Sequence, residues 1–493
     1  MRVSEKMASL IRSILSILSS KVIGLIIGIL FTPILVRVIS QEQYGLYASV
    51  LAAYSVVALV SKGGIFDATR KIIAEDIDDS EHSSGVLTSA LGLSAIYGTI
   101  GVGLGYLILH FDLIPRTYAR YFSLLLLAIL FENLFQVVQG YFHGIKKEHI
   151  GEVLKISRRI FYSAVALALA YIGYDLHGVF LGYTISFVVF CVIGLVVVYR
   201  DSNFLQSPVS GLNKHARYVA SYGGQQLIGG VSALLIYKSD VVLVEFFWGS
   251  TSTALYNSAI VPAEMIWFIP SVIQVVFLQH ASNLWSNDER EKLAEDLKSG
   301  VKYGVLSLAL FGIGLFALSE PFLRVYFGGE YSEASTVLQI LLFGTIFLGV
   351  SRILSPIFHA TGWIRYSNLV TVAGLLLNIG GNIIMVPRFG IIGAGIATAT
   401  SYVAILGGST LIWWRSSLPM VSLRWTLRIV SVQLVFGGLY IGAVYLINLG
   451  PLLSLLFFPP VGLALFLVIN FQAGYLSKEL FENQLGSILG KNI

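Results

Sequence analysis

The chain is poor in charged residues. Asp, Glu, Lys and Arg make up only 12% of its 493 residues, about half the usual share in a soluble domain. Hydrophobic residues make up 56% of the chain, and the mean hydropathy is +0.80. A soluble protein of this length would need far more charge to cover its surface. The composition therefore excludes an ordinary soluble protein and predicts surfaces that face lipid.

Cysteine and soluble-enzyme motifs are also scarce. The one cysteine, Cys191, lies in an apolar run and cannot form an intrachain disulfide. The sequence has no Walker loop, no HExxH, no zinc-spaced cysteines and no GxSxG. We therefore expect no cofactor, no bound metal, no ATP-driven mechanism and no enzymatic activity. The modest net charge of +5 is assigned to cytoplasmic loops rather than to nucleic-acid binding.

Apolar runs of about 20 residues, the length that crosses a bilayer, recur along the chain. We predict an all-α polytopic membrane protein with fourteen transmembrane helices. The predicted spans are 10–38, 44–64, 85–110, 118–142, 153–173, 176–199, 217–246, 253–283, 297–319, 333–360, 366–386, 391–414, 424–447 and 449–472. The connections between them are short, so none is long enough to hold a folded domain outside the membrane.

The basic residues predict the orientation. With fourteen spans, fifteen Lys and Arg residues fall on the side of the N-terminus and five on the other side. The positive-inside rule then places both termini in the cytoplasm of a multi-pass plasma-membrane protein. The N-terminal apolar stretch is too long for a signal peptide and no A-x-A-like cleavage site follows it, so we expect a retained first helix.

Short matches at an offset of 209 to 216 residues indicate an internal repeat. The matched pairs are Tyr47 and Tyr256, Ser49 and Ser258, Phe142 and Phe358, His143 and His359, Gly178 and Gly393, and Ser186 and Ser401. Six helices per repeat is an even number, so both repeats would insert in the same orientation. We predict two pseudo-symmetric six-helix lobes, 1–200 and 201–415, and an additional helix pair with a short cytoplasmic tail, 416–493.

Polar residues inside predicted spans are the first candidates for function, because they are costly in lipid. In the fourth span Glu132, Gln136, Gln139 and His143 fall on one helix face. That face either lines a cavity between the lobes or holds one lobe together by hydrogen bonds between helices. We take the cavity as the working hypothesis, with substrate passing between the lobes by alternating access.

Other candidates are scattered over both predicted lobes. For substrate binding we add Arg12, Lys21, Lys62, Gln225, Lys238, Arg352 and His359. Arg12 could equally snorkel to the headgroups, and Lys62 lies at the predicted cytoplasmic end of the second span. Asp240 and Glu264 are candidates for ion coupling, with a structural salt bridge as the alternative reading of Asp240. Lys21 and Arg352 are the cations best placed to touch a phosphate.

Four stretches resemble the polysaccharide transporter, or O-antigen flippase, family of the superfamily that also holds multidrug extruders and lipid II flippases. They are RVISQEQYGLYASV (37–50), KSDVVLVEFFWGSTSTALYNSAI (238–260), FGGEYSEASTVLQIL (327–341) and NLVTVAGLLLNIGGNIIMVPRFGIIGAGIATATS (368–401). The last is the most diagnostic, through Asn378, Asn382, Pro387, Gly390, Gly393 and Ala397. These are mainly packing and turn features, so they specify fold better than substrate.

The resemblance implies a flippase that moves a polyprenyl or dolichyl phosphate-linked oligosaccharide from the cytoplasmic to the outer leaflet. Lys and Arg would then face the phosphate, and Gln and His the sugar hydroxyls. The partners would be this glycolipid, membrane lipids and a coupling ion, H⁺ or Na⁺. We expect a monomer that does not bind nucleic acid. Whether it associates with glycan-assembly enzymes is an open question.

Two rival functions remain. An ion-coupled multidrug or organic-cation antiporter of the same superfamily is one, because basic and acidic candidates are nearly balanced in number. A membrane-embedded glycan polymerase or ligase is the other, but it would need a sizeable outward loop, and the outward connections predicted here are too short to form one.

Overall fold

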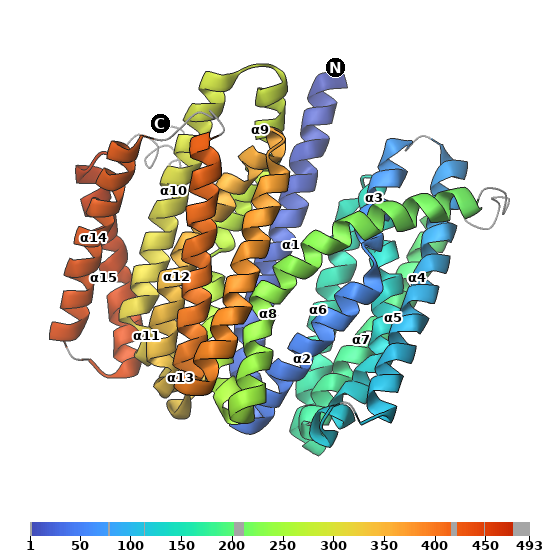
Figure 1. Ribbon diagram of the computed structural model, residues 1–493, viewed down its shortest axis with the longest axis horizontal. Coiled ribbons are helices and arrows are strands. Elements are labelled where there is room, and N and C mark those ends of the chain that lie inside the picture. Colours follow the sequence, from blue (N-terminus) through green and yellow to red (C-terminus); the bar gives the residue numbers. More distant parts are fainter. Residues whose placement is uncertain are drawn as a thin grey trace, which may run out of the picture. The chain divides into compact units, whose positions relative to one another are not determined.

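The computed structural model describes residues 2–76, 79–112, 114–201, 212–415, 422–447 and 449–476 (Figure 1). These residues are almost wholly helical. The helices are α1 (Arg2–Val38), α2 (Gln41–Lys62), α3 (Ile65–Glu75), α4 (Ser80–His110), α5 (Arg116–Gly144), α6 (Glu148–Leu169), the π-helix η1 (Ala170–Tyr174), α7 (Asp175–Asp201), α8 (Leu212–Met265), α9 (Phe268–Ser286), α10 (Arg290–Ala317), α11 (Ser319–Tyr326), the 3₁₀-helix η3 (Gly329–Ala334), α12 (Ser335–Ala360), α13 (Ile364–Arg415), α14 (Leu423–Leu446) and α15 (Pro451–Gln472).

Within the described residues, ten helical segments are long and apolar enough to cross a membrane, or eleven if the bent helix α8 is included. Three of them are far longer than a bilayer requires: residues 148–201, 212–265 and 364–415 have 52 to 54 residues each. At about 1.5 Å per residue, such a helix would extend about 80 Å if straight. Each is therefore interrupted, and the exact number of crossings stays a prediction.

The interruptions are sharp reversals of the chain. Gly390 of α13 has φ 57° and ψ −137°, and a Cβ atom on Gly393 would collide with the Met385 carbonyl. Residues eight apart on a straight helix are about 12 Å from one another, so the chain folds back here. In the same way a Cβ atom on Gly178 would lie 2.6 Å from the Cβ of Leu169. Both glycines are needed because two helix ends meet at them.

The described residues form two compact units, Met1–Ala254 and Leu255–Ile493. In the first, α5 is the central helix and packs against α2, α3, α4, α6 and α7. Helices α4, α5 and α7 lie side by side (Figure 1). Gly140 and Gly144 of α5 allow close contact with α3, because a Cβ atom on either would lie within 3 Å of an α3 atom. Cys191 of α7 is fully buried.

In the second unit α12 takes the central place and packs against α9, α10 and α13. Helices α14 and α15 pack on α10 and α11 through a cluster that includes Phe436, Tyr440 and Phe458. Gln433 of α14 donates a hydrogen bond to Asn470 of α15 at 2.8 Å, and both are buried. This polar pair joins the last two helices where water is not available.

Some positions that the predicted repeat matches share local geometry. Ser49 donates to the Leu46 carbonyl and Ser258 to the Leu255 carbonyl, both at the offset of 209. At the offset of 215, Ser186 donates to the Tyr183 carbonyl and Ser401 to the Thr398 carbonyl. Asp175, with φ 45° and ψ −135°, shares the unusual backbone conformation of Gly390. The lobe boundaries at 200 and 415, and the relation of the lobes to each other, stay predictions.

The fold-back in α13 gives a testable prediction. Gly393→Leu places a side chain against backbone that cannot move without separating the two helix ends, and we expect it to cost about 1–3 kcal/mol of stability. Gly380→Leu is the control, because no described atom lies within 4 Å of a Cβ built there. The measurement is the thermal unfolding midpoint of the detergent-solubilised protein. Equal midpoints for the two variants would contradict the fold-back.

Candidate functional site

A break in the second span positions the candidate site. Helix α2 ends at Lys62, Gly63 and Gly64 follow with φ of 57° and 68°, and α3 continues from Ile65. Such left-handed conformations favour glycine. Together α2 and α3 form one apolar segment of 35 residues. The predicted end of the span at 64 coincides with this break. The position of the membrane surface along α2 and α3, and with it the place of Lys62 at the cytoplasmic end, stays a prediction.

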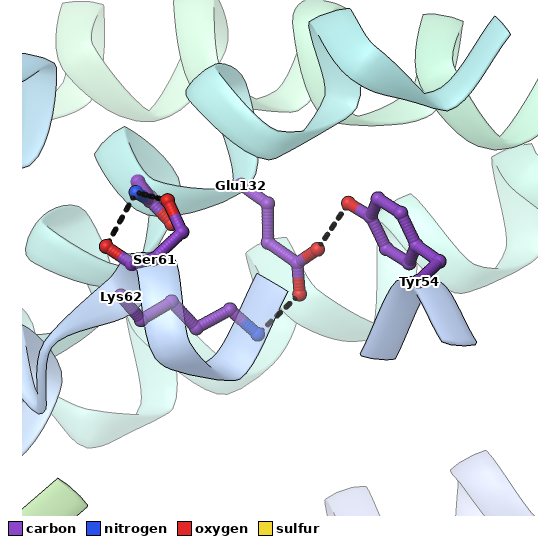
Figure 2. Close-up of polar contacts among 5 residues, drawn as sticks. Tyr54, Ser61, Lys62 and Glu132 are labelled. Carbon is purple, nitrogen blue, oxygen red and sulfur yellow. Dashed lines mark hydrogen bonds and ion pairs between the residues drawn. The ribbon is translucent and has the colours of Figure 1, made fainter. Parts of the chain in front are cut away.

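At this break Lys62 forms an ion pair with Glu132 of α5. The Lys62 ammonium lies 2.6 Å from one Glu132 carboxylate oxygen, and the Tyr54 hydroxyl donates to the other at 2.6 Å (Figure 2). The Lys62 and Glu132 side chains are 20% and 9% exposed. Glu132 lies twelve residues before the end of α5, about 18 Å along the helix. The pair is therefore well inside the length of α5, which has 29 residues and is longer than one bilayer crossing needs.

The residue next to Glu132 holds the end of α2 in place. The Asn133 amide donates to the Ser61 carbonyl at 3.0 Å and to the Ser61 hydroxyl at 2.9 Å. Ser61 in turn donates to the Tyr97 carbonyl of α4 at 3.0 Å. These bonds satisfy the end of α2 where the break leaves its carbonyls without helical partners. They also fix the backbone from which Lys62 extends toward Glu132.

A second cation, Arg158 of α6, belongs to the same part of the first unit. Its guanidinium lies 3.9 Å from the centre of the Phe187 ring and donates to the Ser186 hydroxyl at 3.2 Å. Its buried Nε has no hydrogen-bond partner among the described residues. Arg158 is ten residues from the start of α6, about 15 Å along the helix and so at a depth similar to that of Glu132.

Tyrosines fill the space around these charges. The Tyr54 and Tyr162 rings each meet the Tyr183 ring edge-on, with centroids 5.5 and 5.4 Å apart, respectively. The Tyr47 hydroxyl lies 3.2 Å from that of Tyr162. We call Lys62, Glu132, Arg158 and these four tyrosines the charged cluster. It contains two cations and one anion, so it is net basic by composition.

The other polar residues of the predicted α5 face have different partners. Gln139 is buried and donates to the Gly151 carbonyl at 2.9 Å. His143 lies 3.4 Å from the buried carboxylate of Glu152 and meets the Phe66 ring edge-on. Gln136 is half-buried. The face therefore divides: Glu132 joins the charged cluster, while Gln139 and His143 contact the start of α6.

The remaining candidates of the first unit differ in burial. Lys21 of α1 and Gln225 of α8 are exposed, and Lys238 is half-buried. Asp240 is fully buried and accepts a hydrogen bond from the Val241 amide at 2.8 Å. The side chain of Arg12 lies outside the described residues.

In the second unit Arg352 of α12 donates to the Ser271 hydroxyl at 3.1 Å, and its guanidinium lies 4.5 Å from the centre of the Trp267 ring. Trp267 donates to the Thr345 carbonyl at 2.7 Å. By the repeat offsets Arg352 corresponds to Gln136 and Ser271 to Lys62, so the second unit has a cation on its central helix. Glu264 is half-buried in α8 and His359 is exposed.

Sequence reasoning did not single out Arg158, Ser271 or Trp267. The signal for Arg158 was present: two consecutive arginines lie well inside a 54-residue apolar segment. For Ser271 and Trp267 there was no such signal, because neither residue is costly in a membrane and a partner for Arg352 cannot be identified from spacing.

Comparison with family models gives two matches. The model described as polysaccharide biosynthesis protein matches residues 10–281. The model described as lipid II flippase MurJ matches residues 159–450. Each covers more than half of the 493 residues, and their overlap spans the end of the first unit and the start of the second.

Individual relatives are distant. A probable low-salt glycan biosynthesis flippase of Haloferax volcanii, Agl15, is 25% identical over 401 residues, or 80% of this chain and 81% of the relative. The inward closed structure of the lipid II flippase MurJ superposes with a TM-score of 0.73 at 14% identity, over 96% of this chain and 99% of that one. An inward-facing multidrug transporter of the MATE family gives 0.62 at 16% identity, over 86% and 96%. The two structures show the fold.

The buried pair gives a second prediction. Glu132→Leu leaves the Lys62 ammonium without its anion at membrane depth, and we expect a loss of about 3–5 kcal/mol. Adding Lys62→Met should restore most of it, because the double variant buries no charge. The measurement is the unfolding midpoint of both single variants and the double variant.

The exposed pair of Lys71 and Glu75 is the control. These groups lie 3.8 Å apart and both side chains are more than 40% exposed. Glu75→Leu should change stability by less than about 1 kcal/mol. Additive effects of Glu132→Leu and Lys62→Met would show that the two side chains are not coupled.

Proposed function

Because the chain belongs to the polysaccharide biosynthesis protein family, we propose that it flips a polyprenyl or dolichyl phosphate-linked oligosaccharide from the cytoplasmic to the outer leaflet by alternating access. The chain is a transporter of lipid-linked glycans and not an enzyme. The lipid carrier, the direction of flipping and the alternating-access mechanism are parts of the proposal. The proposal also includes a plasma-membrane location with both termini in the cytoplasm.

The observation that carries the proposal is the pair of cations within the long apolar helical segments of the first unit, which we place at mid-membrane depth. Lys62 and Arg158 are costly there and are not needed to orient the chain. A phosphate or pyrophosphate has to cross this same region, and it cannot enter hydrocarbon without compensation. Ammonium and guanidinium groups supply strong, charge-assisted hydrogen bonds to phosphate oxygens. The buried Nε of Arg158 is a donor still available for such a bond among the described contacts.

The proposed role of Glu132 is to hold Lys62 while no substrate is bound. An arriving phosphate competes with the carboxylate for the ammonium, so Lys62 never has to exist as an uncompensated buried charge. Gln136, one turn along α5, is placed to hydrogen-bond a sugar hydroxyl. In the second unit Arg352 is the corresponding cation. Lys21, Gln225, Lys238 and His359 remain candidates for contact with the glycolipid.

The cation antiporter is the weaker alternative. A site for an organic cation needs a carboxylate that can face the substrate. Both oxygens of Glu132 are engaged, one by Lys62 and the other by Tyr54. The likeness to a multidrug transporter is one of fold, and it does not argue for a drug as substrate.

The proposal predicts loss of glycan export from Lys62→Gln and Arg158→Gln. Removing one charge-assisted contact to the phosphate costs about 1.5–3 kcal/mol, so export should fall at least about tenfold. The measurement is the lipid-linked oligosaccharide that accumulates in the inner leaflet of a deletion strain carrying each variant. The control is Arg290→Gln, since Arg290 is exposed and pairs with Asp288. Normal export by both variants would refute the phosphate site.

Ion coupling remains a proposal for Asp240 and Glu264. Asp240 is the sharper test, because its carboxylate is fully buried in α8 and Asn keeps its shape and its bond to the Val241 amide. We expect Asp240→Asn to make glycan flipping in proteoliposomes insensitive to a proton or sodium gradient. Flipping that still follows the gradient would make Asp240 a structural residue.

A further inference from the structure

The first unit contains an apolar groove whose three walls are formed by α2, α4 and α8. It has a volume of about 450 Å³, within the range of small-molecule sites. Glycines form parts of the walls, with Gly101 on α4 and Gly224 on α8, so the walls can approach one another. We call it the α2–α4–α8 groove.

The groove opens toward the surroundings of the protein. Val60, Ile100 and Leu104 line it, and each is more than half exposed. In a membrane protein, exposed apolar side chains at this position face lipid. A ligand must therefore enter from the bilayer.

The lining selects an apolar chain. Ser61 is one of the few polar side chains in the lining, and its hydroxyl is already engaged by Asn133 and by the Tyr97 carbonyl. A sugar or a phosphate would lose its hydrogen bonds to water and find few replacements here. A hydrocarbon chain would bury apolar surface and lose nothing.

The position of Lys62 indicates which kind of lipid would place its hydrocarbon chain in the groove. Ser61 and Gly63 line the groove, and Lys62 between them forms the ion pair with Glu132, which we place at mid-membrane depth. An ordinary phospholipid keeps its phosphate at the membrane surface, about 15 Å from the bilayer centre. A transported lipid is different, because its phosphate passes through mid-depth and its chain must then begin there.

We propose that the α2–α4–α8 groove binds the polyisoprenoid chain of the transported glycolipid while its phosphate is at the charged cluster. This inference rests on the proposed function and adds the place of the lipid chain to it. The α2 wall then serves both ends of the substrate, with Lys62 toward the phosphate and Val60 and Ser61 toward the chain.

The test is photolabelling of the full-length protein in phosphatidylcholine vesicles, with a polyprenyl phosphate that carries a benzophenone in its chain. The label should appear on the α4 segment that contains Ile100 and Leu104. Excess unlabelled polyprenyl phosphate should remove it, and the same amount of phosphatidylglycerol should not. Equal competition by phosphatidylglycerol would show that bulk lipid fills the groove, and the proposal would fail.

A matched pair of variants makes the test specific. Gly224→Leu adds a side chain inside the groove, where a Cβ atom meets no described atom within 4 Å. Gly103→Leu adds the same side chain on α4, also with no described atom within 4 Å, but Gly103 does not line the groove. Labelling should fall about tenfold with Gly224→Leu, as for a contact of about 1.4 kcal/mol, and should be unchanged with Gly103→Leu.

A second variant, Leu104→Trp, fills the groove from its α4 wall and should lower the labelling by a similar factor. It takes the place of Gly224→Leu in the test if Gly224→Leu does not fold. Equal labelling of all variants would overturn the groove proposal, while the export loss of Lys62→Gln and Arg158→Gln would still support the function. Normal export in those two strains, with labelling lowered as expected, would overturn the phosphate site and the assignment of the chain to the transported glycolipid, and would leave only a polyprenyl phosphate site in the groove.

Discussion

A carboxylate inside a bilayer has to be neutralised by its own protein, and the first unit is arranged around that demand at Glu132. The Lys62 ammonium and the Tyr54 hydroxyl engage its two oxygens. For Lys62 to reach Glu132, α2 ends in the middle of an apolar segment, and Gly63 and Gly64 adopt the left-handed conformations that follow. Asn133 then binds the last turn of α2. One ion pair thus accounts for a helix break, its glycines and its cap.

Much of this was predictable from the sequence. The apolar runs indicated an all-helical membrane protein. Glu132 and Lys62 were both identified as candidates, since charge in a span is conspicuous. What the sequence did not show is that these two residues pair, because they lie 70 positions apart.

Other parts could not be read from one sequence, for physical reasons. The fold-back at Gly390 is not one of them, because the predicted spans 366–386 and 391–414 end and begin on either side of it. The Gln139 amide can bond a neighbouring backbone carbonyl or a sugar equally well, and spacing does not distinguish the two. Arg158 is different, because two arginines deep in an apolar segment are informative, and attention to depth rather than to periodicity would have found it.

The solitary thiol of Cys191 has a consequence for studying motion. It is fully buried in α7, so reagents in water or at the membrane surface do not reach it. A single engineered cysteine at an exposed site would then be the main reactive thiol in the native background. Spin labels attached to one such site in each compact unit would report by electron paramagnetic resonance how the spacing of the units changes during turnover.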